Sequence, residues 1–253
     1  MTMRVAFGVG MTAVVAGAAS GQISASSSFD GGPQGWTFGV AARWRATDGH
    51  PGGCVENFGE ATNGPAWAIA SPSFLGDWSS LNGHGTLRFD HKRVTNGGGS
   101  VLSFVPIIVE IIGPGGTARW ESELLPSPGD WRTFEVPIAR AQWQVASDAA
   151  WLAILSNVQT LRIFLEQVSN SAEPEDLNRL DNVSLGVRCD AIDFNGDGLY
   201  PDTADIDDFL SVFSGGPCST GTCSDIDFNN DGLFPDTADI DSLLSVFSGG
   251  PCL

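Results

Sequence analysis

Basic residues are scarce in this sequence, and its C-terminal part has none. The 253 residues include 12 lysines and arginines against 30 aspartates and glutamates, so the formal net charge is -18. Residues 189–253 contain thirteen aspartates and no lysine or arginine. Because a nucleic-acid site needs clustered basic side chains to contact phosphates, this composition argues against a nucleic-acid partner.

The sequence also lacks the short motifs of common catalytic sites. It contains no Gly-x-Ser-x-Gly, no His-Glu-x-x-His and no phosphate-cradling glycine loop. A carboxylate pair of glycosidase type from Glu121, Glu123 or Glu135 is an alternative, but carboxylates alternating along a strand are typical of a solvated face. We expect no enzymatic activity, and ordinary polar roles for the only three histidines, His50, His84 and His91.

Long apolar runs are absent after the N-terminus. Residues 1–20 have the features of a secretory signal peptide, with Arg4 in a short basic start, an apolar stretch from Val5 to Ala19, and small residues at the expected cleavage site. That stretch is short for a membrane span and is interrupted by glycines. We therefore expect an exported protein without a transmembrane segment in its mature form, either secreted or held in the periplasm or at the cell surface.

An acidic sequence motif occurs twice in residues 189–253. The segment from Asp193 to Ile206 recurs 34 residues later, from Asp227 to Ile240, which indicates a duplicated structural unit. Oxygen-bearing side chains at alternate positions, followed by a glycine, are the opening of an EF-hand calcium loop. Apolar residues at helical spacing follow each loop, so we expect two short amphipathic helices that end at Ser-Gly-Gly-Pro. These apolar residues are Ile206, Phe209, Leu210 and Phe213, and Ile240, Leu243, Leu244 and Phe247.

The spacing predicts two calcium sites with matching ligands. The twelfth position of an ordinary loop is Ala204 or Ala238, which offers no ligand, so we expect a loop that is one residue longer and closed by Asp205 or Asp239. Asp207 and Asp241 are the alternative closing residues. The predicted ligands, with carbonyl oxygens from the two leucines, are Asp193, Asn195, Asp197, Leu199, Asp202 and Asp205 in the first copy and Asp227, Asn229, Asp231, Leu233, Asp236 and Asp239 in the second.

Four cysteines bracket the two copies, and export would place them in an oxidising compartment. Cys189, Cys218, Cys223 and Cys252 allow three disulfide pairings. We favour Cys189–Cys218 with Cys223–Cys252, because each copy would then be a closed unit. The pairing of Cys189 with Cys252 and of Cys218 with Cys223 is an alternative that the sequence does not exclude. Cys54 is left over, and we expect it to be free or occluded.

The tandem loop-helix units resemble a dockerin domain, and more narrowly the cysteine-bracketed dockerin-type modules of bacterial secreted proteins. The resemblance covers Cys189 to Cys252 and rests on the two D-x-N-x-D-G loops and the closing Phe-Ser-Gly-Gly-Pro-Cys. It implies a cohesin-type or cell-surface receptor as partner, with attachment of the preceding domain to that receptor. Expected partner-facing residues are Asp207, Asp208 and Ser211, and Asp241, Ser242 and Ser245.

Residues 22–188 have the pattern of a mainly β domain. Short apolar segments separated by Gly, Pro, Asn and Asp predict a β-sandwich. One helix is expected within residues 147–157, capped by Ser147, with Trp151, Leu152 and Leu155 on one face. The predicted strands cover residues 66–70, 85–91, 101–112, 117–123, 131–138, 161–167 and 182–187.

The same region resembles a laminin B (laminin IV type A) domain. The matching segments include Phe29-Asp30 with Gly35-Trp36, Ser71 to Ser80, Gly85 to Asp90, Trp131 to Pro137, and Leu180 to Leu185. The resemblance implies a jelly-roll sandwich similar to galactose-binding-like and carbohydrate-binding modules. It also suggests polysaccharide binding as an alternative function for the chain.

Two further sites are considered in this region. All eight tryptophans lie before residue 152, and we expect most of them in the core, with Trp44, Trp78 and Trp143 as the candidates for a glycan-binding surface. Asp30 and Asp181 lie near the first and last strands, which often pair in such sandwiches. Related modules hold a structural calcium there, although turn capping is the simpler role for each aspartate.

Overall fold

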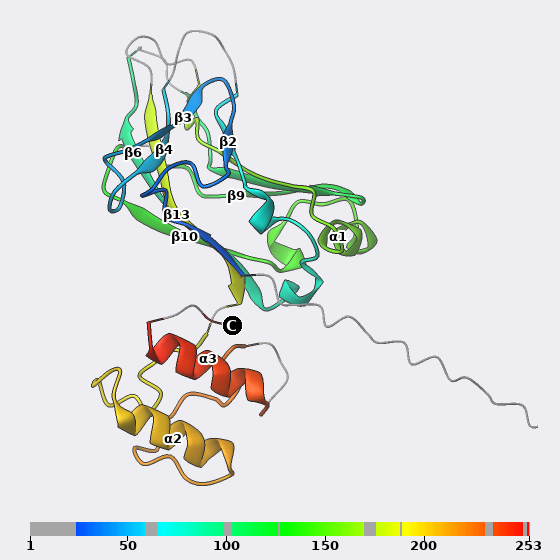
Figure 1. Cartoon of the computed structure of the whole chain (residues 1–253). Helices are drawn as coiled ribbons and strands as arrows, with labels where there is room; N and C mark the ends of the chain where they lie inside the picture. Colours follow the sequence, from blue (N-terminus) through cyan, green and yellow to red (C-terminus); the bar gives the residue numbers. More distant parts are fainter. Residues whose placement is uncertain are drawn as a thin grey trace, which may run out of the picture.

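The computed structural model describes residues 24–58, 65–98, 103–125, 127–169, 176–187, 189–230, 235–249 and 252. Figure 1 shows a β-sandwich followed by two helices that lie side by side at one end of it. The predicted signal peptide and the predicted ligands Asp231 and Leu233 lie outside the described residues. Among the residues described, no helix is long and apolar enough to cross a membrane.

Two antiparallel sheets form the sandwich. One contains six strands, and β1 (Ala25–Ser27) pairs with β13 beside the main order of β10 (Arg132–Pro137), β6 (Gly85–Thr95), β13 (Leu177–Val187), β4 (Cys54–Asn57) and β3 (Ala42–Arg45). The other has the order β2 (Thr37–Phe38), β5 (Trp67–Ile69), β11 (Thr160–Phe164), β8 (Ile108–Gly113) and β9 (Gly116–Glu121). A short pair is formed by β7 (Ser103–Phe104) and β12 (Val168–Ser169).

Alternating side chains from the two sheets make one hydrophobic core. In β6, Leu87 and Phe89 are fully buried and Arg88 between them is exposed. In β8, Val109 and Ile111 are likewise buried. Successive side chains of a strand point to opposite faces, so this alternation places one apolar face of each sheet against the other.

The sandwich agrees with the mainly β fold expected from the sequence, but some elements differ. Predicted strand 101–112 is interrupted between β7 and β8, where Pro106 offers no N–H to a sheet. Strands β1 to β4 and β12 were not among the predicted strands. Three short 3-10 helices are also present, at Pro72–Phe74, Ser79–Leu81 and Arg140–Gln142.

Helix α1 (Asp148–Leu155) begins where predicted. The Ser147 hydroxyl accepts the Ala150 N–H at 3.1 Å, which satisfies one of the free donors of the first turn. Trp151 and Leu155 are buried, but the expectation for Leu152 was wrong, since its side chain is 55% exposed. Ile154 takes the buried position instead.

The second hydrophobic cluster belongs to α2 (Thr203–Phe213) and α3 (Thr237–Phe247). Its four fully buried members are Phe194, Phe209, Phe228 and Leu243, and Phe209 meets both other phenylalanines edge-on. The two copies are also joined by backbone bonds at equivalent positions. The Asp190 N–H donates to the Phe228 carbonyl at 2.8 Å, and the Ser224 N–H to the Phe194 carbonyl at 2.9 Å. The two copies therefore share one hydrophobic core and are hydrogen-bonded to each other.

This crossed arrangement overturns the favoured disulfide pairing. The bonds are Cys189–Cys252 and Cys218–Cys223, the pairing that the sequence left open. Each bond joins the first cysteine of one copy to the last cysteine of the other, so the two bonds are equivalent under the repeat. Neither copy is a closed unit by itself. Cys54 is free and buried, as expected, and burial raises the pKa of its thiol to about 12.

Candidate functional site

The first acidic loop turns its side-chain oxygens inward. Asp193 and Asn195 both accept the Asp197 N–H, at 3.0 and 3.1 Å, through their Oδ1 atoms. The second oxygen of Asp193 accepts the Gly198 N–H at 3.0 Å, and Asp197 accepts the Leu199 N–H at 2.7 Å. Because two side-chain oxygens meet at one N–H, the loop brings the predicted ligands of positions one and three together.

Asp205 closes this loop from the helix. Its carboxylate is fully buried and accepts the Asn195 N–H at 3.4 Å and the Asp202 N–H at 3.1 Å. Asp202 caps α2 in return, accepting the Ala204 N–H at 2.8 Å, so the two aspartates form a capping box. Asp207 is exposed on the helix. The geometry thus favours Asp205 over Asp207 as the closing residue and gives Asp202 a capping role.

The second copy repeats this arrangement. Asp239 is fully buried and accepts the Asn229 N–H at 3.5 Å and the Asp236 N–H at 3.0 Å, while Asp236 caps α3. Burial raises the pKa of the Asp239 carboxyl, and the negative charges of Asp227 and Asp236 add to this, against the hydrogen bonds that lower it. The charges of Asp227 and Asp236 thus act on the buried Asp239 carboxyl in the same direction as burial. Asp241 is exposed.

Donor groups of these loops fit a calcium ion in type. All are oxygen atoms, which is what this hard cation requires. The buried carboxylates also belong to a segment without a single lysine or arginine. No side-chain cation of residues 189–253 is available to compensate them.

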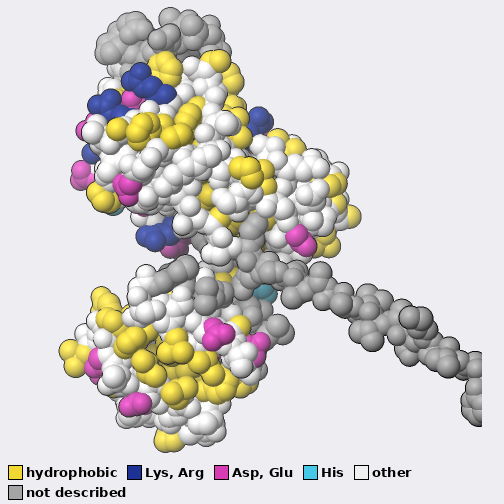
Figure 2. Space-filling model, viewed as in Figure 1, with side chains coloured by type: hydrophobic (Ala, Val, Ile, Leu, Met, Phe, Trp, Pro, Cys, Tyr) yellow, Lys and Arg dark blue, Asp and Glu magenta, His cyan; other side chains and the backbone are white. Residues whose placement is uncertain are grey.

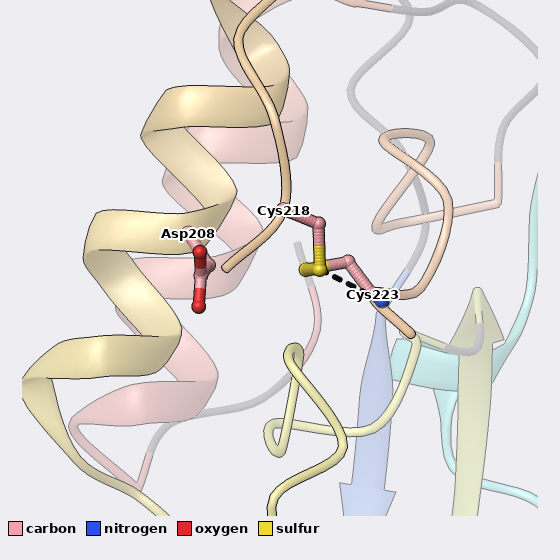
Figure 3. A group of neighbouring side chains, drawn as sticks. All are labelled: Asp208, Cys218 and Cys223. Carbon is pink, nitrogen blue, oxygen red and sulfur yellow. Dashed lines mark hydrogen bonds between the residues drawn. A yellow bond between two sulfur atoms is a disulfide. The ribbon is translucent and has the colours of Figure 1, made fainter. Parts of the chain in front are cut away.

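A second grouping with metal-ligand atoms lies beside α2 and is structural. Asp208, Cys218 and Cys223 bring their ligand atoms within 4.8 Å of one another, as Figure 3 shows. Both sulfur atoms are used in a disulfide, so neither is available as a thiolate. Asp208 accepts the N–H and hydroxyl of Ser219, at 2.8 and 2.6 Å, and the Asn195 amide at 3.1 Å. It ties the disulfide loop to the first acidic loop.

The prediction that Asp208 and Ser242 face a partner is wrong. Asp208 and its equivalent Ser242 are buried, and the Asp208 carboxylate is already bonded to Ser219 and Asn195. The outer sides of the helices carry exposed leucines instead, and Figure 2 shows hydrophobic side chains gathered on this part of the molecule. Among the described residues of this region, the exposed large hydrophobic side chains are Leu199, Tyr200, Leu210 and Leu244.

The prediction that Trp78 and Trp143 could form a glycan-binding surface is also wrong. Trp78 is fully buried and donates from Nε1 to the Phe74 carbonyl, and Trp143 is 3% exposed. Trp44 packs against the core and donates to the Phe29 carbonyl at 2.9 Å. The half-buried rings are Trp67, Trp120 and Trp131 in addition to Trp44.

One outward face of the sandwich combines rings and charges. On the sheet of β5, β11 and β8, Trp67 and Phe164 are cross-strand partners with ring centroids 4.8 Å apart. The Arg162 guanidinium lies 4.2 Å from the centre of the Trp67 ring and donates to Glu110 at 2.8 Å. We call Trp67, Phe164, Arg162 and Glu110 the aromatic face.

Asp30 and Asp181 lie close to each other, as the pairing of β1 and β13 suggested. Asp181 is fully buried and accepts the N–H groups of His50 and Asn182. Burial raises the pKa of the Asp181 carboxyl to about 6; those hydrogen bonds lower it, whereas the charges of Asp30 and Asp90 raise it. A calcium ion between Asp30 and Asp181 stays a prediction.

The glutamates considered for catalysis have surface roles where their contacts are described. Glu121 pairs with Arg119 at 2.6 Å, and Glu123 pairs with Arg132 at 2.9 Å. These ion pairs are exposed and fit the solvated-face interpretation. They give no support to a glycosidase pair.

Comparison with known proteins found solved structures that are similar to part of this chain. No protein-family model and no curated protein matches the chain. The L4b domain of human laminin alpha-2 is similar with 13% identity and a TM-score of 0.40, over 49% of this chain and 71% of that one. A family 11 carbohydrate-binding module from Clostridium thermocellum, solved with a beta-1,3-1,4-mixed-linked tetrasaccharide, has 16% identity and a TM-score of 0.42, over 65% and 95%. A CBM22-1 xylan-binding domain from Paenibacillus barcinonensis Xyn10C has 13% identity and a TM-score of 0.36, over 66% and 95%. Likeness at this level assigns neither ligand nor activity to this chain.

Proposed function

We propose that residues 189–253 form a calcium-dependent docking module that attaches the non-catalytic sandwich to a receptor of cohesin type or another cell-surface protein. The observation that carries the proposal is the pair of equivalent carboxylates of Asp205 and Asp239. Both are fully buried where an acidic loop meets a helix, in a segment without basic residues. Burying an uncompensated charge is unfavourable, and a calcium ion held by the loop oxygens would neutralise it.

The docking step follows from the positions of the exposed residues. Asp207 and Leu210 of α2 lie on its outer side, and Asp241 and Leu244 occupy the equivalent positions of α3. An exposed leucine beside an acidic group suits a protein partner. Calcium would hold the loops and thereby the helices that present these residues.

A calorimetric calcium titration of the oxidised, chelator-treated chain tests the first step. We expect two sites in residues 189–253, with one lost in Asp193→Ala and one in Asp227→Ala. Retention of both sites in these variants would contradict the loop assignment. Absence of binding would reduce the tail to an acidic, disulfide-linked spacer.

Receptor capture tests the second step. The wild-type chain should retain a partner from envelope extracts in calcium and release it in chelator. The double variant Leu210→Asp, Leu244→Asp should bind calcium as before but lose capture. If capture survives this change, the docking surface lies elsewhere.

Polysaccharide binding by the sandwich is a second candidate, and the aromatic face favours it. An outward sheet face with two aromatic rings and a hydrogen-bonded Arg–Glu pair offers both stacking and polar contacts to sugar rings. In affinity electrophoresis against a polysaccharide panel, Trp67→Ala should reduce binding. Trp131→Ala, a half-buried ring outside this face, is the matched control. Equal losses in both variants would contradict the assignment.

A further inference from the structure

One end of the sandwich interior is polar. Along β6 the inward positions Leu87 and Phe89 are followed by His91 and Arg93, which are 1% and 3% exposed. Arg132 of β10 is the cross-strand partner of His91. Because alternate residues of a strand share one face, His91 and Arg93 continue the core row in place of apolar residues, whereas the side chain of Arg132 is 55% exposed at the edge of this end.

A cavity of about 190 Å³ opens at this end. Its lining includes His91, Arg93 and Arg132, with Ser127 and Asp130 at the loop that precedes β10. The Gly129 N–H donates to the Arg93 carbonyl and holds that loop against β6. The open end of a β-sheet structure is a common place for a ligand pocket.

Two of the lining residues carry unpaired donors. Within the described part of the chain, both ring nitrogens of His91 and the Nε and Nη1 atoms of Arg93 have no hydrogen-bond partner. Only Nη2 of Arg93 donates, to the Gln167 carbonyl at 3.2 Å. Buried polar groups are normally paired, so the two free guanidinium nitrogens of Arg93 and the one N–H of the neutral His91 ring point to an acceptor group between them.

Neighbouring carboxylates do not use up this capacity. Asp176 offsets part of the Arg93 charge electrostatically, but one of its oxygens accepts from Asn57 and Asn178 at 3.3 and 2.6 Å. Glu123, which pairs with Arg132, is 69% exposed in its side chain. The guanidinium groups of Arg93 and Arg132 can therefore still donate hydrogen bonds to a bound anion.

We propose that this cavity binds an oxyanion, a carboxylate or sulfate group, between Arg93, Arg132 and His91. Guanidinium groups match planar or tetrahedral oxyanions through charge-assisted hydrogen bonds, and a neutral imidazole can donate one more. The proposal is independent of the calcium loops and of the aromatic face, which belong to other surfaces.

Imidazole NMR of the full oxidised chain tests it directly, because the chain has only three histidines. Sulfate, glucuronate and neutral glucose are titrated in turn. We expect the His91 ring signals to move with sulfate and glucuronate, while exposed His84 stays unchanged and glucose has no effect. No movement of His91 with either anion would overturn the proposal.

Variants and a larger probe complete the test. Arg132→Gln should weaken anion binding about tenfold or more, the loss expected for a hydrogen bond to a charged group. Arg88→Gln removes an exposed arginine from the other face of β6 and should have no effect; equal weakening would mean general attraction and overturn the site. A glucuronate-containing oligosaccharide that binds more tightly than the free ions identifies a saccharide as the source, whereas equal affinity identifies a small anion.

Discussion

Asp205 and Asp207 are two residues apart in α2, yet their environments are opposite. Asp205 is fully buried against the loop, and Asp207 is in solvent. Sequence spacing alone left both as closing ligands, because the lengthened loop fits either. Only the direction of the side chain, which the capping box fixes, separates them.

This difference predicts the outcome of a charge-removal experiment. Asp205→Asn with Asp239→Asn keeps the shape but removes two buried ligand charges, so calcium affinity should fall by about tenfold or more at each site. Asp207→Asn with Asp241→Asn is the matched control and should bind normally. Calorimetry distinguishes the two; the reverse result would make the exposed aspartates the ligands.

His91 predicts an effect of pH on the sandwich. Burial, with the charges of Arg93 and Arg132, lowers the pKa of His91 to about 3, below its ordinary value of 6.5. The unfolded chain therefore binds more protons between these values, and the free energy of unfolding should fall as pH drops from about 6.5 toward 3, by at most about 1.4 kcal/mol per pH unit. Denaturant unfolding should show a shallower slope for His91→Leu than for wild type. His84→Leu should keep the wild-type slope.

At the scale of elements, the sequence predicted what depends on local order. The 34-residue offset predicted two equal helices, and each ends before a glycine with positive φ, Gly215 or Gly249. Contacts between residues that are far apart in the sequence could not be predicted from local order. Trp78 has polar neighbours in sequence, yet it is buried because its turn faces the core, and the copies share a core that no single copy contains.

The crossed disulfides make a prediction at this scale. Cys189–Cys252 closes a loop of sequence separation 63, and Cys218–Cys223 one of 5. In the chain-entropy account, losing the first costs about 4 kcal/mol of unfolding free energy and losing the second about 2. Paired Cys→Ser variants measured by denaturant unfolding should show this order. The opposite order would contradict the loop-entropy account.

Peptide mapping checks the pairing itself. Trypsin has no site in residues 189–253, because they lack lysine and arginine, so a protease that cleaves at aspartate is needed. The non-reduced digest should contain the Cys218–Cys223 bond within one short peptide. A bond between peptides holding Cys189 and Cys218 would restore the pairing that was first favoured.

For the whole molecule, charge is distributed unequally between two hydrophobic cores. Residues 22–188 contain eleven of the twelve basic residues, several of them in ion pairs such as Arg43–Glu56 at 2.8 Å and Arg162–Glu110; the twelfth is Arg4. The helical pair contains thirteen aspartates and no basic residue. Calcium should therefore act on the stability of the two parts very differently.

Calorimetric scans of the oxidised chain should reveal this as two unfolding transitions. At a calcium concentration about 100 times Kd, each occupied site in the helical pair adds about 2.7 kcal/mol, because the ion binds the folded loops only. The corresponding transition should move to higher temperature with calcium and return with chelator, and Asp193→Ala with Asp227→Ala should abolish the shift. A calcium ion at Asp30 and Asp181 would in addition raise the sandwich transition, and Asp30→Asn would remove that rise alone. If calcium moves neither transition, the buried aspartates are compensated without metal and the docking proposal loses its basis.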